Sequence, residues 1–481
     1  MSESGTVAQW TRPENAVLLL FAATLAWMPF PYGSNRPWAE LLLAVALGGL
    51  LLAWSGLVMS GLAVQTPLVR RLKWPAICAG VALLWALVQS VDLAWLQQVT
   101  GLPFTGIAHA VWGLSAHALG KPAGAYVSVD PEGTRQALVA ALVSLSAFML
   151  AFNLGRDRDR AAFIAGSLIV ITSAYALLAI VMLELKIDLQ AWVLPEARSD
   201  FGRLAGPFMN PNHFAAFIAL GAIAALGAFA ERVRQSVIWD RGSRVIARSV
   251  MQSLTGPNSL LLAAVVLLLS ALLLTQSRAA VASFVVGVLA LSVMLSRGRD
   301  LSVAEASGRR AIVALLVAVL GLSMALSADP LLNRVGTYGL NDTTRSSIAM
   351  STIKAVQSAP LQGHGFGGFE HYYPFFSDGT VAGTVDEAHN DVLETLSDLG
   401  VPAGLAYMAA PVMIAFMCFG GAARRRRDRV YPAVAVAASV CAGLHALADF
   451  SLQVPAVAVS FAVLLGIGAA QSWRTNMDMV R

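Results

Sequence analysis

Two apolar runs joined by four residues make up the stretch 259–296, which reads SLLLAAVVLLLSALLL, then TQSR, then AAVASFVVGVLALSVMLS. Each run approaches the roughly 20 residues that an α-helix needs to cross the hydrocarbon core of a bilayer. Only the short TQSR segment interrupts the apolar pattern, so we expect a tight helical hairpin with Arg278 at its turn. The stretch therefore predicts a fold of membrane-spanning helices.

The rest of the chain repeats this pattern. Hydrophobic residues make up 57% of its 481 residues and charged residues only 13%, which is not a soluble globular composition. The first apolar run follows a polar start without a clear cleavage site, so we read it as a span rather than a removable signal. Altogether the apolar runs predict twelve spans, at residues 15–30, 38–59, 74–91, 135–154, 161–183, 212–230, 258–275, 279–296, 311–327, 400–421, 432–449 and 455–472.

The basic residues predict the orientation of these spans. Of the 33 Lys and Arg, 23 fall in segments on the side of the N-terminus and ten in segments on the other side. By the positive-inside rule both termini lie in the cytoplasm. The net charge of +5 is thus a topogenic signal, and we expect no nucleic-acid partner. The three cysteines, Cys78, Cys418 and Cys441, all lie in apolar runs and are expected to be small core residues.

A polar stretch, residues 328–399, separates the ninth and tenth spans on the outer side. It divides the chain into helices 1–9 (residues 1–327), this loop, and helices 10–12 with a cytoplasmic tail (residues 400–481). Loops of this length inside a compact protein are usually functional. We therefore expect the loop, with its short helices, to be the catalytic part of a membrane enzyme.

The polar side chains gather on the outer side of the predicted topology, whereas the middle of the spans carries almost no ionisable group. An ion-coupled transporter binds its coupling ion near the midplane, so this distribution favours an enzyme at the outer surface. The residues concerned are Arg203, Asn210, Asn212, His213, Arg278, Arg345, His364, His371, His389, Asn390, Asp391 and Asp449.

Three arginines are candidate contacts of an anion. Arg278 is either a snorkelling interfacial charge or a planar set of donors aimed at a phosphate. Arg345 is expected in the first turn of a helix that runs to Gln357, where the helix dipole does not favour a cation. Arg203 precedes the turn at Asn212 and could join an anion site at the N-terminus of the following span.

His389 is the candidate general base. It opens an amphipathic helix that Asn390 or Asp391 can cap, and an imidazole near carboxylates is a natural proton acceptor near neutral pH. Asp386, Glu387 or Asp391 could orient the ring. No His or Cys partner stands at metal-binding spacing, so we expect no metal site. The glycine-rich segment 363–368, which includes His364, is either a backbone anion nest or a plain turn.

Several of these motifs resemble the bacterial O-antigen ligase/polymerase family. The similarity runs from about Arg203 to Pro455, and its most specific part is the AHND motif at residues 388–391 with the glycine-rich loop before it. The motifs that carry it are GPFMNPN (206–212), the Ser277-Arg278 turn, PLQGHGFGGF (360–369), AHND and LETLSDLGVP (393–402). The tryptophan that often follows the family's loop arginine by about four residues is missing here, where Ala349 and Met350 stand instead.

The resemblance implies an all-α polytopic protein of the bacterial inner membrane, with about twelve transmembrane helices and a large periplasmic loop between spans 9 and 10. It implies transfer of a glycan from undecaprenyl diphosphate to a glycan or lipid-linked acceptor, without metal, nucleotide sugar or other cofactor. Membrane lipids and a polysaccharide-assembly complex are the further partners it suggests. A lipid-linked glycan flippase is the alternative, and a scaffold in an export complex is a more distant one.

Carried over residue by residue, the family's catalytic residues map onto Arg278, Arg345 and His389. Residues 442–450, AGLHALADF, resemble a late motif of exopolysaccharide members and favour a polymerase over an O-antigen (lipopolysaccharide) ligase. We expect the substrate-binding residues to be Arg203, Asn212, His213, His364, Asn390 and Asp391.

Overall fold

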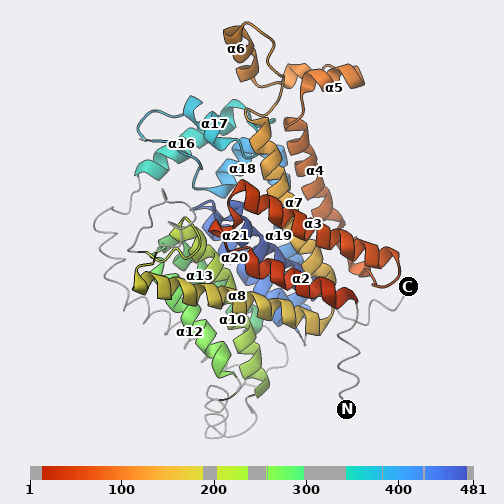
Figure 1. The fold of residues 1–481 in the computed structure, drawn as a ribbon, viewed down its shortest axis with the longest axis vertical. Coiled ribbons are helices and arrows are strands. Elements are labelled where there is room, and N and C mark those ends of the chain that lie inside the picture. The colour runs from red at the N-terminus through yellow and green to blue at the C-terminus, as the bar shows by residue number, and fades with distance from the viewer. Residues whose placement is uncertain are drawn as a thin grey trace.

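A computed structural model describes residues 13–187, 203–236, 256, 258–296, 343–381, 383–425 and 428–473. All of its regular elements are helices within these residues (Figure 1). Among the described residues, seven helical segments are long and apolar enough to cross a membrane: Pro37–Met59 (α3), Pro67–Gln89 (ending in α4), Pro131–Leu154 (α7), Arg158–Leu185 (α8), Pro211–Gln235 (in α10), Arg278–Ser296 (α13) and Val401–Arg424 (α19). Four shorter apolar helices accompany them: Pro13–Trp27 (α2), Ser259–Leu274 (α12), Val430–Ala446 (α20) and Pro455–Ala470 (α21).

These helices lie where eleven of the twelve spans were predicted, and the chain is a multi-pass membrane protein. The remaining span, 311–327, lies outside the described residues, so the number twelve and the orientation stay predictions. The hairpin at 259–296 forms as its sequence predicts, with α12 ending at Leu274 and α13 beginning at Arg278.

The core of the bundle is built around α10 and α20. The membrane-length part of α10 is 89% buried, whereas that of α3 is only 17% buried, so α10 lies inside the bundle and α3 at its edge. Alanines dominate α20, which packs against α10, α13, α19 and α21. Small residues let these backbones approach closely. A Cβ on Gly468 of α21, for example, would lie 2.2 Å from the Cβ of Ala435.

The connection between α20 and α21 is recessed into the protein. These helices have 17 and 16 residues, so at about 1.5 Å per residue each spans about 25 Å, less than a hydrocarbon core of roughly 30 Å. The connecting segment 447–454 includes the short helix Ser451–Gln453 (η5), and Asp449 within it is fully buried. Polar groups of this segment are therefore enclosed by helices.

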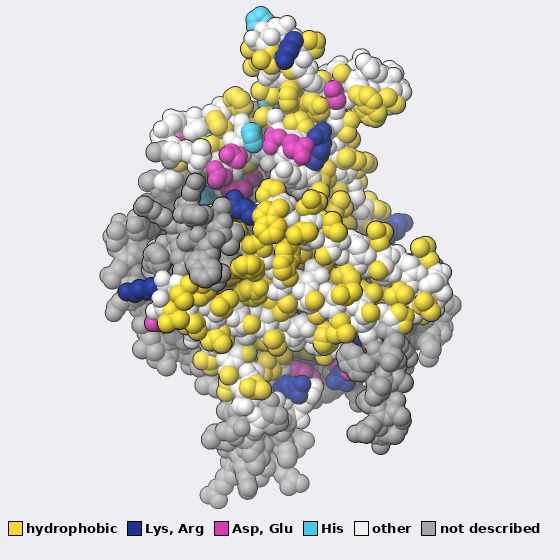
Figure 2. All heavy atoms as spheres, viewed as in Figure 1, with side chains coloured by type: hydrophobic (Ala, Val, Ile, Leu, Met, Phe, Trp, Pro, Cys, Tyr) yellow, Lys and Arg dark blue, Asp and Glu magenta, His cyan; other side chains and the backbone are white. Residues whose placement is uncertain are grey.

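The large loop folds over this segment. Its described part contains Thr343–Ser358 (α16), Phe369–Tyr372 (α17), Tyr373–Phe375 (η4) and Asp391–Leu399 (α18). Figure 1 shows α16, α17 and α18 together at one end of the bundle. The segment between α4 and α7, with Leu93–Thr100 (α5), Phe104–Ile107 (η3) and Ala110–Leu119 (α6), projects beyond them. Figure 2 shows a broad apolar surface on the bundle, with charged and histidine side chains gathered at this end.

Candidate active site

Asp449 is the centre of the candidate site. Its side chain is fully buried in the segment 447–454, and its Oδ1 faces two imidazoles. His389 Nδ1, from the large loop, lies 3.5 Å from this oxygen. His213 Nε2, from the first turn of α10, lies 3.9 Å from it. One carboxylate thus joins residues that are far apart in the sequence.

The backbone around His389 is shaped to direct its ring toward Asp449. His389 has a φ of 52°, a left-handed conformation that is uncommon for residues other than glycine. The next residue, Asn390, caps α18, because its Oδ1 accepts hydrogen bonds from the backbone N–H groups of Val392 and Leu393 at 3.1 and 3.0 Å. Its Nδ2 donates to the carbonyl of Leu447 at 3.0 Å. Asn390 therefore attaches the histidine turn to the segment that carries Asp449.

Arg345 approaches the same carboxylate from its other oxygen. It lies in the first turn of α16, as predicted, and one guanidinium nitrogen donates to the carbonyl of Ala448 at 2.9 Å. The other terminal nitrogen lies 4.0 Å from Asp449 Oδ2. The Arg345 side chain is 38% exposed, so the guanidinium can be reached from solvent while it holds the loop in place.

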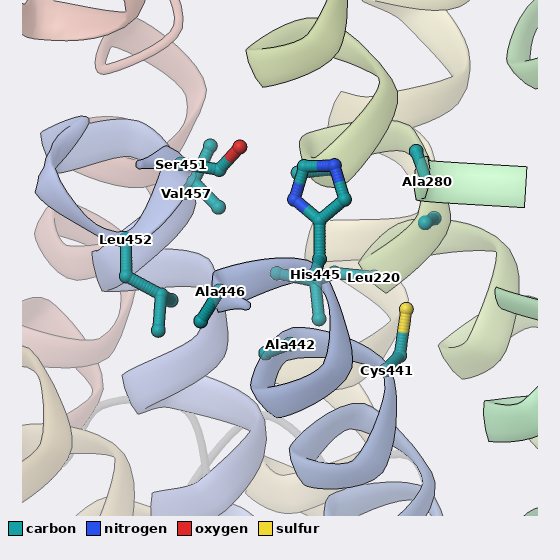
Figure 3. A pocket seen from close by; sticks show the side chains of 11 residues that line it. Leu220, Ala280, Cys441, Ala442, His445, Ala446, Ser451, Leu452 and Val457 are labelled. Carbon is teal, nitrogen blue, oxygen red and sulfur yellow. The ribbon is translucent and has the colours of Figure 1, made fainter. Parts of the chain in front are cut away.

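Arg203, Asn212 and Arg278 lie at the adjoining hairpin. Arg203 donates to the carbonyl of Thr275 and to Asn212 Oδ1, both at 3.2 Å, so it links the start of α10 to the α12–α13 turn. Arg278 is exposed at the first residue of α13, and no contact with Asp449 is seen among the described residues. Two residues later, Ala280 borders the same small cavity as His445 of α20 and Ser451 of the α20–α21 connection (Figure 3).

Asp391 and Glu394 support the site from the buried face of α18. Asp391 Oδ2 accepts from the N–H of Leu452 at 3.3 Å, and Glu394 Oε1 accepts from Gln453 Nε2 at 2.8 Å. Burial and the neighbouring Glu394 raise the pKa of Asp391 well above its ordinary value. Burial and the neighbouring Glu394 likewise raise the pKa of Glu387. These carboxyl groups are structural ties between α18 and the segment 447–454.

The structure places His364 away from Asp449. Its Nε2 donates to the carbonyl of Ala355 at 3.0 Å, and its Nδ1 lies 3.1 Å from Nε2 of His109. His109 Nδ1 in turn accepts from the N–H of Val111 at 3.2 Å, so the whole chain of hydrogen bonds is satisfied by two neutral rings. Its geometry gives His364 a structural role in attaching the segment between α4 and α7 to the large loop.

The backbone N–H groups of the glycine-rich segment 363–368 form hydrogen bonds with other parts of the protein. The N–H groups of His364 and Gly365 donate to the carbonyls of Ser397 and Asp398, both at 3.0 Å. The N–H of Gly367 donates to Asp398 Oδ2 at 2.6 Å, and that of Phe366 to Gln89 Oε1 at 3.1 Å. The group held by this backbone is thus the chain's own Asp398.

Unsatisfied polar atoms are concentrated around Asp449. Six buried side-chain atoms there have no hydrogen-bond partner among the described residues: His213 Nε2, His389 Nδ1, both ring nitrogens of His445, Asp449 Oδ2 and Ser451 Oγ. Leaving one such atom without a partner costs about 1–3 kcal/mol. These atoms leave hydrogen-bonding capacity around Asp449 that the described residues do not fill.

The electrostatics of Asp449 suit a general-base site. Burial disfavours its charged form, but His389 Nδ1 at 3.5 Å, His213 Nε2 at 3.9 Å and the N–H of Phe450, which donates to its Oδ1 at 3.0 Å, all stabilise the anion. Asp449 is thus an anion that favours a proton on His389 Nδ1. His389 Nε2 is then left as the proton-accepting atom of a ring whose side chain is 31% exposed.

Asp449 and His445 are the residues that sequence reasoning did not place in the site. Asp386, Glu387 or Asp391 was expected to orient His389, whereas the carboxylate that meets its ring is Asp449. The available signal was the pair His445 and Asp449, four residues apart at the end of an apolar run, because ionisable groups at such positions usually mark function. No group of three or more His, Cys, Asp or Glu that could hold a metal occurs within the described ranges.

Residues 263–408 match the family model Wzy_C, described as O-antigen ligase. The match includes Arg278, Arg345, His389, Asn390 and Asp391, and it ends before Asp449. No curated protein matches the chain. The matched region supplies the two arginines and the histidine at the end of the bundle where Asp449 lies. Residues 263–408 of this multi-pass membrane protein are therefore similar to the O-antigen ligase family that the Wzy_C model describes.

Proposed function

We propose that the protein is a membrane glycosyltransferase that moves a glycan from undecaprenyl diphosphate to a hydroxyl group of an acceptor sugar. The reaction would take place on the periplasmic side of the bacterial inner membrane, in the polymerisation or ligation of a surface polysaccharide. The observation that carries this proposal is the buried Asp449 carboxylate, which holds His389 on one oxygen and lies 4.0 Å from Arg345 on the other. The family match supports the reaction class.

In the proposed reaction, Nε2 of His389 removes the proton of the acceptor hydroxyl. The oxygen attacks the anomeric carbon, the bond from that carbon to the diphosphate breaks, and its electron pair leaves with the diphosphate. Asp449 stabilises the positive charge that forms on the imidazole, and a positioned base of this kind contributes about 10²–10⁴-fold. Direct attack inverts the anomeric configuration.

The cations at this end of the protein would bind the leaving diphosphate. Arg345 approaches the carboxylate that also contacts the base, and Arg278 at the exposed start of α13 would provide a second positive charge. Arginine suits this role because its planar donors match phosphate oxygens and remain charged at any physiological pH. Arg203, His213 and Asn212 would complete the substrate-binding side of the site.

The test is glycan transfer by purified protein in vesicles that contain a polyprenyl-diphosphate-linked glycan and its acceptor. We expect His389→Ala to bind the lipid-linked donor as the wild type does and to lose transfer. His117→Ala, which removes an exposed imidazole from α6, is the matched control and should transfer normally. Full transfer by the His389 variant would overturn the base assignment. Movement of the donor across the bilayer without transfer would favour a flippase.

A second experiment separates the two forms of the proposed reaction. Deletion of the gene is followed by electrophoresis of the surface glycan. Single repeats that remain attached to their carrier indicate that the protein is a polymerase. Long chains that accumulate on the polyprenyl carrier indicate that it is a ligase.

A further inference from the structure

A small cavity lies directly behind the Asp449 segment. Its walls come from α10, α13, α20 and the start of α21, and they are mostly apolar, with Leu220, Ala280, Cys441 and Val457 among them. His445 and Ser451 are the polar side chains among its lining residues. Figure 3 shows the His445 ring standing up from α20 into this space, with Ser451 on one side and Ala280 on the other.

These two polar side chains are almost completely enclosed and find no partner within the described part of the chain. His445 is 3% exposed and Ser451 is 2% exposed. Neither ring nitrogen of His445 nor Oγ of Ser451 makes a hydrogen bond to a described residue. Buried polar atoms in proteins nearly always have a partner, either protein or ordered water. Three such atoms facing one cavity therefore indicate a polar occupant.

The size of the cavity decides what that occupant is. It offers about 10 Å³ to the centre of a water molecule, which is close to the minimum of about 10–15 Å³ needed to hold one water. A sugar ring or an isoprenoid unit is many times larger. An apolar atom would fit the walls but would leave His445 and Ser451 without hydrogen bonds.

We infer that this cavity binds a single water molecule between His445 and Ser451, and that His445 acts through it as a positioning residue for Asp449. The geometry of the chain supports the positioning role of His445. His445 lies one helical turn before Asp449, and the N–H of Asp449 donates to the carbonyl of His445 at 3.0 Å. Ser451 lies two residues after Asp449. A water that joins both side chains therefore fixes the segment on either side of the carboxylate.

The position of Asp449 matters because its carboxylate oxygens lie 3.5–4.0 Å from the His389, His213 and Arg345 side chains. Its Oδ1 must stay within reach of His389, and a displacement of about 1 Å in a reacting group can cost about 10²-fold in rate. The charged and titratable groups that face it from other elements are His213 of α10, Arg345 of α16, and His389 and Asp391 of the large loop. The water site thus holds the carboxylate from within the bundle while these groups hold it from outside. The inference that His445 positions Asp449 rests on the proposed glycan transfer.

The water itself is tested without any assay of activity. A structure of the purified wild-type protein at a resolution that shows ordered water should contain one density peak within hydrogen-bond distance of His445 and Ser451. The same peak should be absent from His445→Leu, whose side chain cannot bond to it. A dry cavity in the wild type would overturn the inference.

Its role in the reaction is tested by three variants in the vesicle assay. We expect His445→Leu to lower kcat by about 10- to 100-fold with KM nearly unchanged, because the substrate contacts remain. His445→Gln, which can both donate and accept, should recover most of the loss. Ser439→Ala removes a hydroxyl group from the same helix, one that donates to the carbonyl of Ala435 and does not line the cavity, and should behave as the wild type.

The outcomes distinguish this inference from the proposed function. Equal rates for His445→Leu and the wild type, or equal losses in His445→Leu and His445→Gln, would overturn the positioning role. If the wild type transfers no glycan at all, the proposed function fails. The water peak and its loss in His445→Leu would still decide whether the site exists.

Discussion

Nδ1 of His389 lies 3.5 Å from Oδ1 of Asp449, although sixty residues of sequence and the whole of α19 and α20 separate them. The contact places a buried anion behind one nitrogen of the ring and leaves the other nitrogen facing outward. The large loop and the α20–α21 connection are also joined by hydrogen bonds of Asn390, Arg345 and Asp391. Each of these ties keeps the imidazole and the carboxylate at a fixed separation.

Asp449→Asn is expected to lower glycan transfer by about 10²–10⁴-fold while donor binding is retained. The amide keeps the shape of the side chain but no longer stabilises a positive charge on His389, and it can turn its NH₂ group toward the ring. Single-turnover transfer and equilibrium binding of the lipid-linked donor measure the two effects separately. The control is Asp378→Asn, a substitution of a fully exposed carboxyl in the same loop. Unchanged transfer by Asp449→Asn would remove Asp449 from the site.

Much of the fold could be predicted because this protein folds in the apolar interior of a membrane. Long runs such as 259–274 have no stable alternative to a helix in a membrane, and helices occur at every described span that the sequence predicts. The amphipathic helix after His389 also begins where it is expected, at Asp391, because Asn390 is a good N-cap residue, and it ends at Leu399 before Gly400.

The pairing of side chains in the site could not be predicted to the same extent. Sequence proximity favoured Asp386, Glu387 or Asp391 as the partner of His389. The actual partner is Asp449, which follows α19 and α20 in the sequence. Such a contact depends on how α18 packs over the α20–α21 connection. The glycine-rich segment was ambiguous for the same reason, because the group that its N–H donors meet, Asp398, becomes adjacent only in the folded loop.

Arg345→Lys is expected to lower transfer by about ten-fold, and Arg345→Ala by more, with a higher KM for the donor. Lysine keeps the charge but lacks the planar set of donors, so it cannot hold the carbonyl of Ala448 and approach Asp449 together. Steady-state transfer at varied donor concentration measures both parameters. Lys354→Ala removes an exposed cation from the same helix, α16, and should have little effect. Equal transfer rates and equal KM values for Arg345→Lys and the wild type would contradict a role for the planar set of guanidinium donors.

Acid is expected to loosen the attachment between the large loop and the α4–α7 segment. Burial, and then the neighbouring charge of His364, lower the pKa of His109 from 6.5 to about 4. The neutral ring is therefore the form that the folded state favours. Its contribution is complete above about pH 6.5 and is lost as the pH falls from there through about 4. The pKa of His364 is also lowered, chiefly by burial.

Amide hydrogen exchange can follow this change. The N–H of Val129 donates to the carbonyl of His364 at 2.8 Å, so peptides containing Val129 should lose protection between pH 6.5 and 4, after correction for intrinsic exchange. His109→Asn should show weaker protection at neutral pH and less dependence on acid. His117→Ala, on the exposed side of α6, should follow the wild type. Acid-independent protection of Val129 in the wild type would contradict the role of the histidine pair.

Gly363→Ala is expected to disrupt the large loop, whereas Gly379→Ala in the same loop should be tolerated. Both glycines have left-handed φ values, 69° and 73°, so alanine at either position carries a similar backbone cost of about 1–2 kcal/mol. Their surroundings differ. A Cβ on Gly363 would lie 2.1 Å from the carbonyl oxygen of Asp398 and 2.5 Å from the nitrogen of Gly400, whereas nothing lies within 4 Å of one on Gly379.

The clash at Gly363 involves backbone atoms that cannot turn aside as a flexible side chain could. Relief would separate the glycine-rich segment from the end of α18 and break the hydrogen bonds of His364 and Gly365 to Ser397 and Asp398. Limited proteolysis of the purified variants should therefore cut the loop of Gly363→Ala much faster than that of Gly379→Ala. Transfer should fall with the loss of protection, because α18 carries the histidine turn that meets Asp449. A protected loop with full transfer in Gly363→Ala would show that the segment 363–368 does not hold α18 in place.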